Sequence, residues 1–364
     1  MTRIGLAGCG SVSGPYLADL RSCRCASVVA LCDPVAGRAE ARAREFGIAS
    51  WFTCLRDMLD GAEFDLLVNT TPMQEHYAVS LAALQAGKHV WSEKPLAGSL
   101  AEGRDLINTA RDRGVRIWCA PTVVASPAYA RMEGVLRSGQ IGTVYAARAW
   151  YGHGGPGWGP WFYARGGGAM FDLAVYNMTT LTGLLGPALS VTAMTGTAIP
   201  ERTVDGLRVC AQAEDNLALI MDHGSSVFSV VQSGFVYGPH WEERTIELVG
   251  TRGGLSMLGW DWLPNGVEVW REDGSREMLC SGAEGYSWEQ GASHVATSLA
   301  TGSEPVFAVE HAFHVLEVML AAHESAATGH AVTVRSRFAG TEPARGEARP
   351  SPLDPDGHIC PRWN

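Results

Sequence analysis

The fold is decided by the stretch Ile4-Gly5-Leu6-Ala7-Gly8-Cys9-Gly10-Ser11-Val12-Ser13. Its first four residues form a short apolar run, which is typical of a strand buried on both faces. Two glycines follow and a helical pattern begins, and such a turn can hold a pyrophosphate at the helix N-terminus. Ser13 stands where a third glycine is usual, but its small side chain still permits close packing of helix on strand. The stretch predicts a dinucleotide site containing Gly8, Gly10, Ser11, Val12 and Ser13.

A carboxylate follows the second apolar run of the chain, residues 28–32. Asp33 closes this expected strand, where a carboxylate can accept hydrogen bonds from the adenosine ribose of a dinucleotide. The same charge would repel a 2'-phosphate. The sequence therefore favours NAD over NADP as the cofactor.

Further apolar runs at 66–69, 89–91 and 116–119 alternate with helical patterns. This alternation predicts an α/β domain over 1–121, a doubly wound parallel sheet of the Rossmann type.

The pattern changes beyond residue 121. Helical signals near 126–137 and 169–185 lead into a strand-rich region, 188–281, and helical signals return over 288–328. We expect 122–335 to form an α/β domain with a large, mostly antiparallel open sheet, and 336–364 to be an extended or disordered tail. Because an open sheet must cover its apolar face, this domain predicts a homodimer or homotetramer.

Composition argues against several classes of protein. Asp and Glu number 38 against 28 Lys and Arg, so the basic surface that nucleic acid requires is missing. We find no signal-peptide pattern and no apolar run long enough for a membrane span, which predicts a cytoplasmic protein without a membrane partner. Nine cysteines without a C-x-x-C pair argue against a zinc knuckle. The histidines and glutamates over 310–323 are expected on a packed helix with surface histidines, so we predict no metal.

The distribution of basic residues singles out one position. Of the 28 basic residues only Lys88 and Lys94 are lysines. Arginine cannot release its proton in a protein, whereas lysine can serve as an acid or a base. Ordinary helix-end chemistry accounts for Lys88, but Lys94 lies where a strand should end. Lys94 is therefore a candidate for a position that needs an amine.

A glycine-rich segment, 152–168, contains Trp158, Trp161, Phe162 and Tyr163. Such a loop suits one wall of a pocket for a polar ligand, and aromatic packing beneath a loop is an equally good interpretation. The candidates for contact with a substrate are Trp161 and Tyr163, together with His153 in the same loop and His240 after a later strand. Either histidine can equally be a solvated loop residue.

At this point several motifs together resemble one family. They are the G-C-G-x-x-S turn, Thr70-Thr71-Pro72 with His76, the string Ala86-Gly87-Lys88-His89-Val90 running into Glu93-Lys94-Pro95, and Gly166-Gly167-Gly168 ahead of Asp172. The chain resembles the Gfo/Idh/MocA (glucose-fructose oxidoreductase, inositol dehydrogenase, MocA) oxidoreductases over about residues 3 to 334. The resemblance implies hydride transfer between NAD and a secondary alcohol or ketone of a sugar, glycoside or cyclitol, in a homo-oligomer.

The resemblance also implies roles for particular residues. Thr70, Thr71, Pro72 and His76 would lie along the nicotinamide side. Glu93 and Lys94 belong to the E-K-P motif and would contact the cofactor, and Lys94 would also be a catalytic or substrate-orienting amine. The second motif of the family is usually D-x-x-x-H, but here it runs from Asp172 to Tyr176. A branch of the family with a tyrosine at this point, after G-G-G, is most similar to this chain.

The tyrosine changes the chemistry that the motif implies. A phenol is a weaker general acid at neutral pH than an imidazole, but an ammonium beside it, such as that of Lys94, would favour the phenolate. Asp172, one helical turn earlier, is expected to orient Lys94 or bind a substrate hydroxyl. We thus expect Lys94, Asp172 and Tyr176 to be catalytic and to contact substrate. The alternative is that Tyr176 only fills space.

Two other functions stay open: a redox-neutral epimerase or eliminase with recycled NAD, and a dinucleotide-binding sensor without catalysis.

Overall fold

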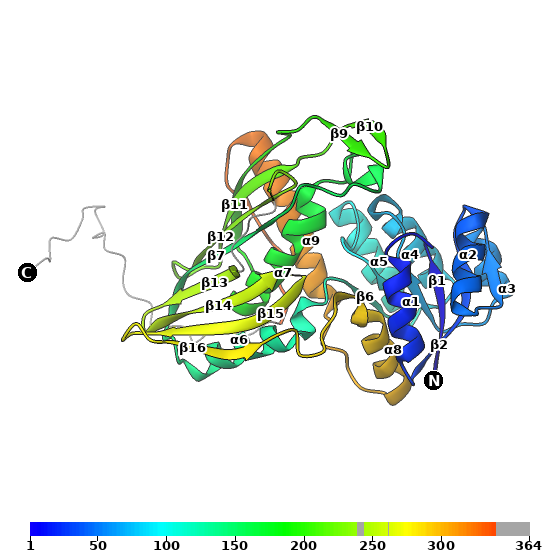
Figure 1. Ribbon diagram of the computed structural model, residues 1–364, viewed down its shortest axis with the longest axis horizontal. Coiled ribbons are helices and arrows are strands. Elements are labelled where there is room, and N and C mark those ends of the chain that lie inside the picture. The colour runs from blue at the N-terminus through cyan, green and yellow to red at the C-terminus, as the bar shows by residue number, and fades with distance from the viewer. Residues whose placement is uncertain (239–243, 261, 340–364) are drawn as a thin grey trace, which may run out of the picture.

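The computed structural model describes residues 1–238, 244–260 and 262–339 of the chain. The N-terminal part forms a six-stranded parallel sheet in the order β3-β2-β1-β4-β5-β6, with helices between the strands (Figure 1). The strands are β1 Thr2–Ala7, β2 Ala26–Cys32, β3 Ser50–Phe52, β4 Leu66–Asn69, β5 His89–Ser92 and β6 Ile117–Cys119. The helices are α1 Ser13–Ser22, α2 Ala36–Phe46, α3 Leu55–Gly61, α4 His76–Gln85 and α5 Leu100–Asp112. This is the doubly wound sheet that the sequence predicts.

The sequence did not predict β3. This strand has three residues, of which Ser50 and Trp51 are exposed at the sheet edge. It therefore lacks the continuous apolar run that marks the buried strands, such as β4, whose four residues are all buried.

The C-terminal part is built on a nine-stranded sheet in the order β16-β15-β14-β13-β7-β12-β11-β8-β17. Its neighbouring strands are antiparallel except for β7 and β12, which run parallel. Their bounds are β7 Val144–Gly152, β8 Ser190–Gly196, β11 Asn216–Asp222, β12 Phe228–Gly234, β13 Arg244–Gly250, β14 Gly253–Trp260, β15 Leu263–Arg271, β16 Arg276–Ser281 and β17 Val332–Thr333. The expected open, mostly antiparallel sheet is confirmed. The central strand β7 was not expected, because its three alanines favour a helix.

Helices cover one face of this sheet, on the side toward the N-terminal part (Figure 1). They are α6 Pro127–Ser138, α7 Val175–Leu185 and α9 Val309–Thr328. A separate hairpin, formed by β9 Glu201–Val204 and β10 Leu207–Cys210, extends from the sheet. The registers of β7, β8, β11, β12 and β13 place six exposed apolar side chains on the opposite face, namely Trp150, Met194, Ile220, Phe228, Val230 and Val249.

One helix from the C-terminal half returns to the first sheet. Helix α8, Gly291–Thr301, lies beside α1 in Figure 1. Its buried residues Ala292, Val295 and Ala296 share a core with Ile4 and Leu6 of β1. The expected helical region 288–328 is therefore two helices that pack on different sheets.

The expected tail, 336–364, lies beyond the described residues from 340 onward. In the part of the chain that the structure describes, no helix is both long enough and apolar enough to cross a membrane.

Candidate active site

A cavity of about 440 Å³ lies where the carboxyl ends of β1, β2, β4 and β5 face the C-terminal half of the chain. This is the crevice in which doubly wound sheets bind ligands, because the strand order reverses between β1 and β4. Its wall contains most of the residues that the sequence singled out: Gly8, Gly10, Ser11, Val12, Asp33, Thr70, Thr71, Pro72, His76, Glu93, Lys94, Trp161, Asp172 and Tyr176.

The glycine turn has the geometry that a bound phosphate requires. Gly8 has a φ of +95°, and a Cβ there would lie 2.6 Å from the backbone of Thr70, so only glycine fits this position. Apart from Gly10 and its two chain neighbours, no atom of the described residues lies within 4 Å of the point that a Cβ on Gly10 would occupy, which leaves the backbone open to a ligand. Ser13 is buried and donates from Oγ to Gly10 O at 2.6 Å. The Ser13 side chain therefore stabilises the turn internally and is not among the residues that line the cavity.

Asp33 is fixed at the cavity edge with only 5% of its surface exposed. Its Oδ2 accepts from Cys9 N at 2.9 Å and its Oδ1 from Val35 N at 2.8 Å. Each oxygen keeps a lone pair for a ribose hydroxyl. Arg38 lines the same part of the cavity and was not expected. Together with the glycine turn, this arrangement fits a dinucleotide.

Lys94 and Asp172 form a close ion pair at the cavity wall. The Lys94 Nζ lies 2.6 Å from Asp172 Oδ1 and donates to Asp172 O at 2.7 Å. Both side chains are nearly buried, with exposed fractions of 11% and 12%. The same Nζ lies 5.2 Å from the ring centroid of Tyr176. The structure therefore brings together the three residues expected to be catalytic. Lys94 follows β5 of the six-stranded sheet, whereas Asp172 and Tyr176 belong to the C-terminal part of the chain.

Glu93 is held by a buried chain of hydrogen bonds beneath the cavity. Its Oε1 accepts from the Tyr16 hydroxyl at 2.7 Å and its Oε2 from Lys94 N at 3.1 Å. Trp91 Nε1 in turn donates to the Tyr16 oxygen at 3.1 Å. Burial and the neighbouring Glu93 raise the pKa of Tyr16 well above its usual value, so Tyr16 stays a hydrogen-bond donor to the carboxylate.

His76 joins two loops that line the cavity. Its Nδ1 lies 2.8 Å from Pro95 O and its Nε2 lies 3.0 Å from Thr71 O. Burial lowers the pKa of this imidazole. The neutral ring donates to one of these carbonyls, and through its two nitrogens it contacts both the segment after β4 and the E-K-P motif.

The helix that carries Asp172 and Tyr176 begins with an unexpected π-helical turn, Met170–Ala174, ahead of α7. The sequence predicted one regular helix from 169. Glu214, which sequence reasoning missed, anchors the turn: its Oε1 accepts from Met170 N at 2.9 Å and its O from Ala169 N at 3.1 Å. A carboxylate at a helix N-terminus is favoured by the exposed N–H groups.

Aromatic rings form another part of the cavity wall. Trp158 and Phe162 have ring centroids 5.0 Å apart, and Trp161 stacks on Phe162 at 5.7 Å. Trp262 and Trp288 complete this side and, like Met73, were not expected. The capping signal at 287–290 could have placed Trp288 at a helix start but not in the cavity.

Two of the residues expected to contact substrate lie behind this wall. Tyr163 is buried and donates from its hydroxyl to Pro156 O at 2.8 Å. His153 accepts at Nδ1 from Gly155 N at 2.9 Å and stacks on Phe235, and burial lowers its pKa. Neither is among the residues that line the cavity. His240 lies outside the described residues.

The histidines expected on the surface of the last long helix are placed differently. His314 of α9 is fully buried, and its Nε2 accepts from Ala188 N at 3.0 Å. It is buried because α9 packs both on β8 and on α7, so that little of the helix meets solvent. Within the described ranges, no three His, Cys, Asp or Glu side chains gather to hold a metal ion.

Comparison with known proteins follows the same division of the chain. Residues 2–120 match a family model described as an oxidoreductase family with an NAD-binding Rossmann fold, and residues 129–256 match the GFO/IDH/MocA C-terminal domain. The chain is 26% identical to the 1,5-anhydro-D-fructose reductase of Ensifer adhaerens, over 92% of this chain and 99% of the relative. It is 30% identical to the D-glucoside 3-dehydrogenase of Escherichia coli (strain K12), over 50% of this chain and 54% of the relative.

A solved structure shares the fold over nearly the whole length. Levoglucosan dehydrogenase in complex with NADH and L-sorbose superimposes with a TM-score of 0.82 at 19% sequence identity, covering 92% of this chain and 99% of that one.

Proposed function

The chain belongs to the Gfo/Idh/MocA family of oxidoreductases, and from that premise we propose that it transfers hydride between NAD and a secondary alcohol or ketone of a sugar, glycoside or cyclitol. Several relatives that match it are named for reduction or oxidation of such molecules, and others for oxidation of a dihydrobenzenediol. The single observation that carries the proposal is the contact of Lys94 with Asp172 beside Tyr176, in the cavity that also contains the glycine turn.

The bound dinucleotide would supply the hydride acceptor or donor at this site. Gly8, Gly10, Ser11 and Val12 would hold its pyrophosphate and Asp33 its adenosine ribose, with Thr70, Thr71, Pro72 and His76 on the nicotinamide side. Ser13 would act by shaping the turn.

The residues of the chain manage the proton that accompanies the hydride. Asp172 holds the Lys94 ammonium at two oxygens, which fixes the donor that faces a substrate hydroxyl. The Tyr176 hydroxyl carries the second transferable proton at the cavity wall. In the reductive direction the Tyr176 hydroxyl or the Lys94 ammonium would give its proton to the substrate oxygen. In the oxidative direction the phenolate of Tyr176 or the neutral amine of Lys94 would accept the proton of the substrate hydroxyl. Oriented groups of this kind contribute through position as well as acidity.

The aromatic wall supplies the rest of the substrate site. Trp158, Trp161 and Phe162 present flat apolar surfaces to the cavity that Lys94 also lines, and the C–H face of a pyranose or cyclitol ring suits such surfaces. A cavity lined by both polar groups and aromatic rings matches a polyhydroxylated ring.

Cofactor choice follows from charge at the ribose end. Asp33 favours the 2'-hydroxyl of NAD, while Arg38 in the same wall is a feature that would favour a 2'-phosphate. We propose NAD because Asp33 is held rigidly by two backbone amides. In a fluorescence titration Asp33→Ser should reduce the ratio of the Kd for NADP to the Kd for NAD. Arg38→Met should change the Kd for NAD by no more than about threefold. Tighter binding of NADP by the unaltered protein would refute the assignment.

The exposed apolar face of the nine-stranded sheet supports a homodimer or homotetramer. Phe228, Val230 and Ile220 are each more than two-fifths exposed, and Ile220 of β11 pairs in register with Val230 of β12. A patch of this kind is covered in most proteins, and a second copy would cover it symmetrically.

The function is tested by screening NAD and NADP against a panel of sugars, glycosides and inositols, in both directions, by absorbance of the reduced cofactor. Turnover of at least one polyol is expected. A protein that binds NAD tightly but reduces it with no member of the panel would contradict the proposal.

A further inference from the structure

The aromatic wall of the cavity is carried by a loop with little regular structure. Residues 152–168 contain one short 3-10 turn, Pro160–Phe162, between glycine-rich segments. Such a loop has a large conformational entropy to lose. Contacts outside the cavity must therefore keep Trp158 and Trp161 in place.

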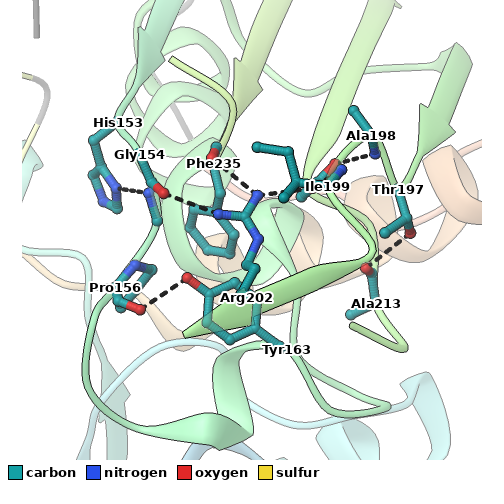
Figure 2. A network of polar contacts seen from close by, with 12 residues as sticks. His153, Gly154, Pro156, Tyr163, Thr197, Ala198, Ile199, Arg202, Ala213 and Phe235 are labelled. Atoms are coloured by element: carbon teal, nitrogen blue, oxygen red, sulfur yellow. Dashed lines mark hydrogen bonds and ion pairs between the residues drawn. The ribbon is translucent and has the colours of Figure 1, made fainter. Parts of the chain in front are cut away.

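Arg202 of the β9–β10 hairpin makes the central contact with this loop. Its guanidinium donates to Gly154 O at 2.9 Å and to Phe235 O at 3.0 Å. Figure 2 shows the side chain reaching between these two backbone segments, above the ring of Tyr163. The Arg202 Cζ lies 5.0 Å from the centroid of that ring, a favourable cation–π distance.

The charge of Arg202 is matched by a buried carboxylate. Asp215, just before β11, lies 2.7 Å from Arg202 through its Oδ2, and the two side chains are 6% and 1% exposed. Asp215 also accepts from Ala198 N at 2.6 Å and from Ile199 N at 2.8 Å. All three partners of this carboxylate lie at or just before the first strand of the hairpin. Asp215 therefore holds the start of the hairpin, from which the Arg202 side chain extends, in a fixed position.

Further bonds bind the hairpin to the same loop. Asp205 N at the hairpin tip donates to Gly157 O at 2.9 Å, and Gln212 N donates to Tyr163 O at 2.7 Å. Gly155 has a φ of +88°, and a Cβ there would lie 2.4 Å from the Tyr163 hydroxyl and 2.7 Å from Arg202 Nη1. The loop is thus fitted closely around the guanidinium.

We propose that Arg202, held by Asp215, is a positioning residue for the substrate site: it clamps the 152–168 loop and so sets the place of the aromatic wall. Neither residue is among those that line the cavity. The inference rests on the proposed function, because the wall is assigned there to the sugar. Lys94, Asp172 and Tyr176 stand on other elements, so the clamp acts on substrate affinity more than on the chemical step.

Arg202→Lys tests the clamp. The ammonium keeps a positive charge beside Asp215 but loses the planar fork that reaches both carbonyls. The matched control is Arg208→Lys, on the other strand of the same hairpin, where the side chain is 79% exposed and pairs with Glu201. We expect Arg202→Lys to raise the KM for the sugar about tenfold or more with kcat within about threefold, and to leave the Kd for NAD unchanged. The control should match the unaltered protein.

Hydrogen exchange gives a readout that is independent of activity. Peptides covering 152–168 should exchange faster in Arg202→Lys and normally elsewhere. Tyr163→Phe, which removes the hydroxyl bond to Pro156 O, should accelerate the same peptides to a smaller extent. Normal loop exchange with an unchanged KM overturns the inference. Faster exchange throughout the chain, or equal losses of kcat and NAD affinity, also overturns it, because the pair would then only stabilise the fold. If the unaltered protein oxidises no sugar, the proposed function fails while exchange still decides on the clamp.

Discussion

Replacing Lys94 by Met removes the ammonium that donates to both the carbonyl and the carboxylate oxygens of Asp172. The carboxylate is only 12% exposed, so the variant leaves a nearly buried charge without its partner. Breaking a buried pair in this way costs about 3 kcal/mol of unfolding free energy. Loss of a group that carries or orients the reacting proton should also reduce turnover by roughly a hundredfold to ten-thousandfold.

A double-mutant cycle separates these two effects. Adding Asp172→Asn removes the stranded charge, so the double variant should recover most of the roughly 3 kcal/mol. Turnover should stay lost, because the amine that carries or orients the proton is still absent. Lys94→Arg keeps a cation beside Asp172 but cannot release a proton, and it should lose nearly as much turnover as Lys94→Met.

Stability is measured by denaturant unfolding, turnover by absorbance of the reduced cofactor, and NAD affinity by fluorescence. NAD should bind all the variants, since the glycine turn and Asp33 are unaltered. The control is Lys88→Met: Lys88 donates to Phe64 O at 2.9 Å and does not line the cavity, so turnover should be retained. If the double variant regained turnover together with stability, Lys94 would act only through the fold and the catalytic reasoning would be wrong.

Three further outcomes are expected. Tyr176→Phe should reduce turnover by roughly a hundredfold when chemistry limits the rate, while Tyr176→His should leave partial activity with the acid limb of the pH profile moved toward neutral pH; full turnover in Tyr176→Phe would transfer the proton role to Lys94 alone. Trp150→Asp, on the exposed sheet face, should yield a smaller species by light scattering than the unaltered protein, and an unaltered protein that is monomeric at micromolar concentration would contradict the proposed interface. Burial lowers the pKa of His311 to about 3 and that of His314 to about 4, so the folded chain holds both neutral while the unfolded chain protonates them below their ordinary value near 6.5. Together these two histidines should lower the unfolding free energy by about 3 kcal/mol per pH unit as pH drops from there toward 4, in addition to the effect of the other buried histidines, and an unchanged slope in His314→Gln would refute this assignment.

The sequence by itself determined the features that depend on short stretches of backbone. A strand, a glycine turn and a helix follow one another within residues 2–22, so apolar run, glycine and helical pattern were enough to predict the turn. The same holds for Asp33 at the end of β2 and for Lys94 just beyond β5. Two strands with a weak local signal were not predicted. They are β3, which is short and lies at a sheet edge, and β7, whose alanines favour a helix.

Only the tertiary structure decided which side chains meet. Lys94 and Asp172 lie 78 positions apart in the chain, and Arg202 reaches a loop 48 positions earlier. Trp262 and Trp288 join the cavity from a strand turn and a helix start, while Tyr163 and His153 lie behind the wall that their neighbours form. The physical reason is that local patterns fix backbone conformation and burial, whereas the composition of a cavity depends on how two sheets and the helices between them pack. That packing is set by contacts between segments that no short window of sequence contains.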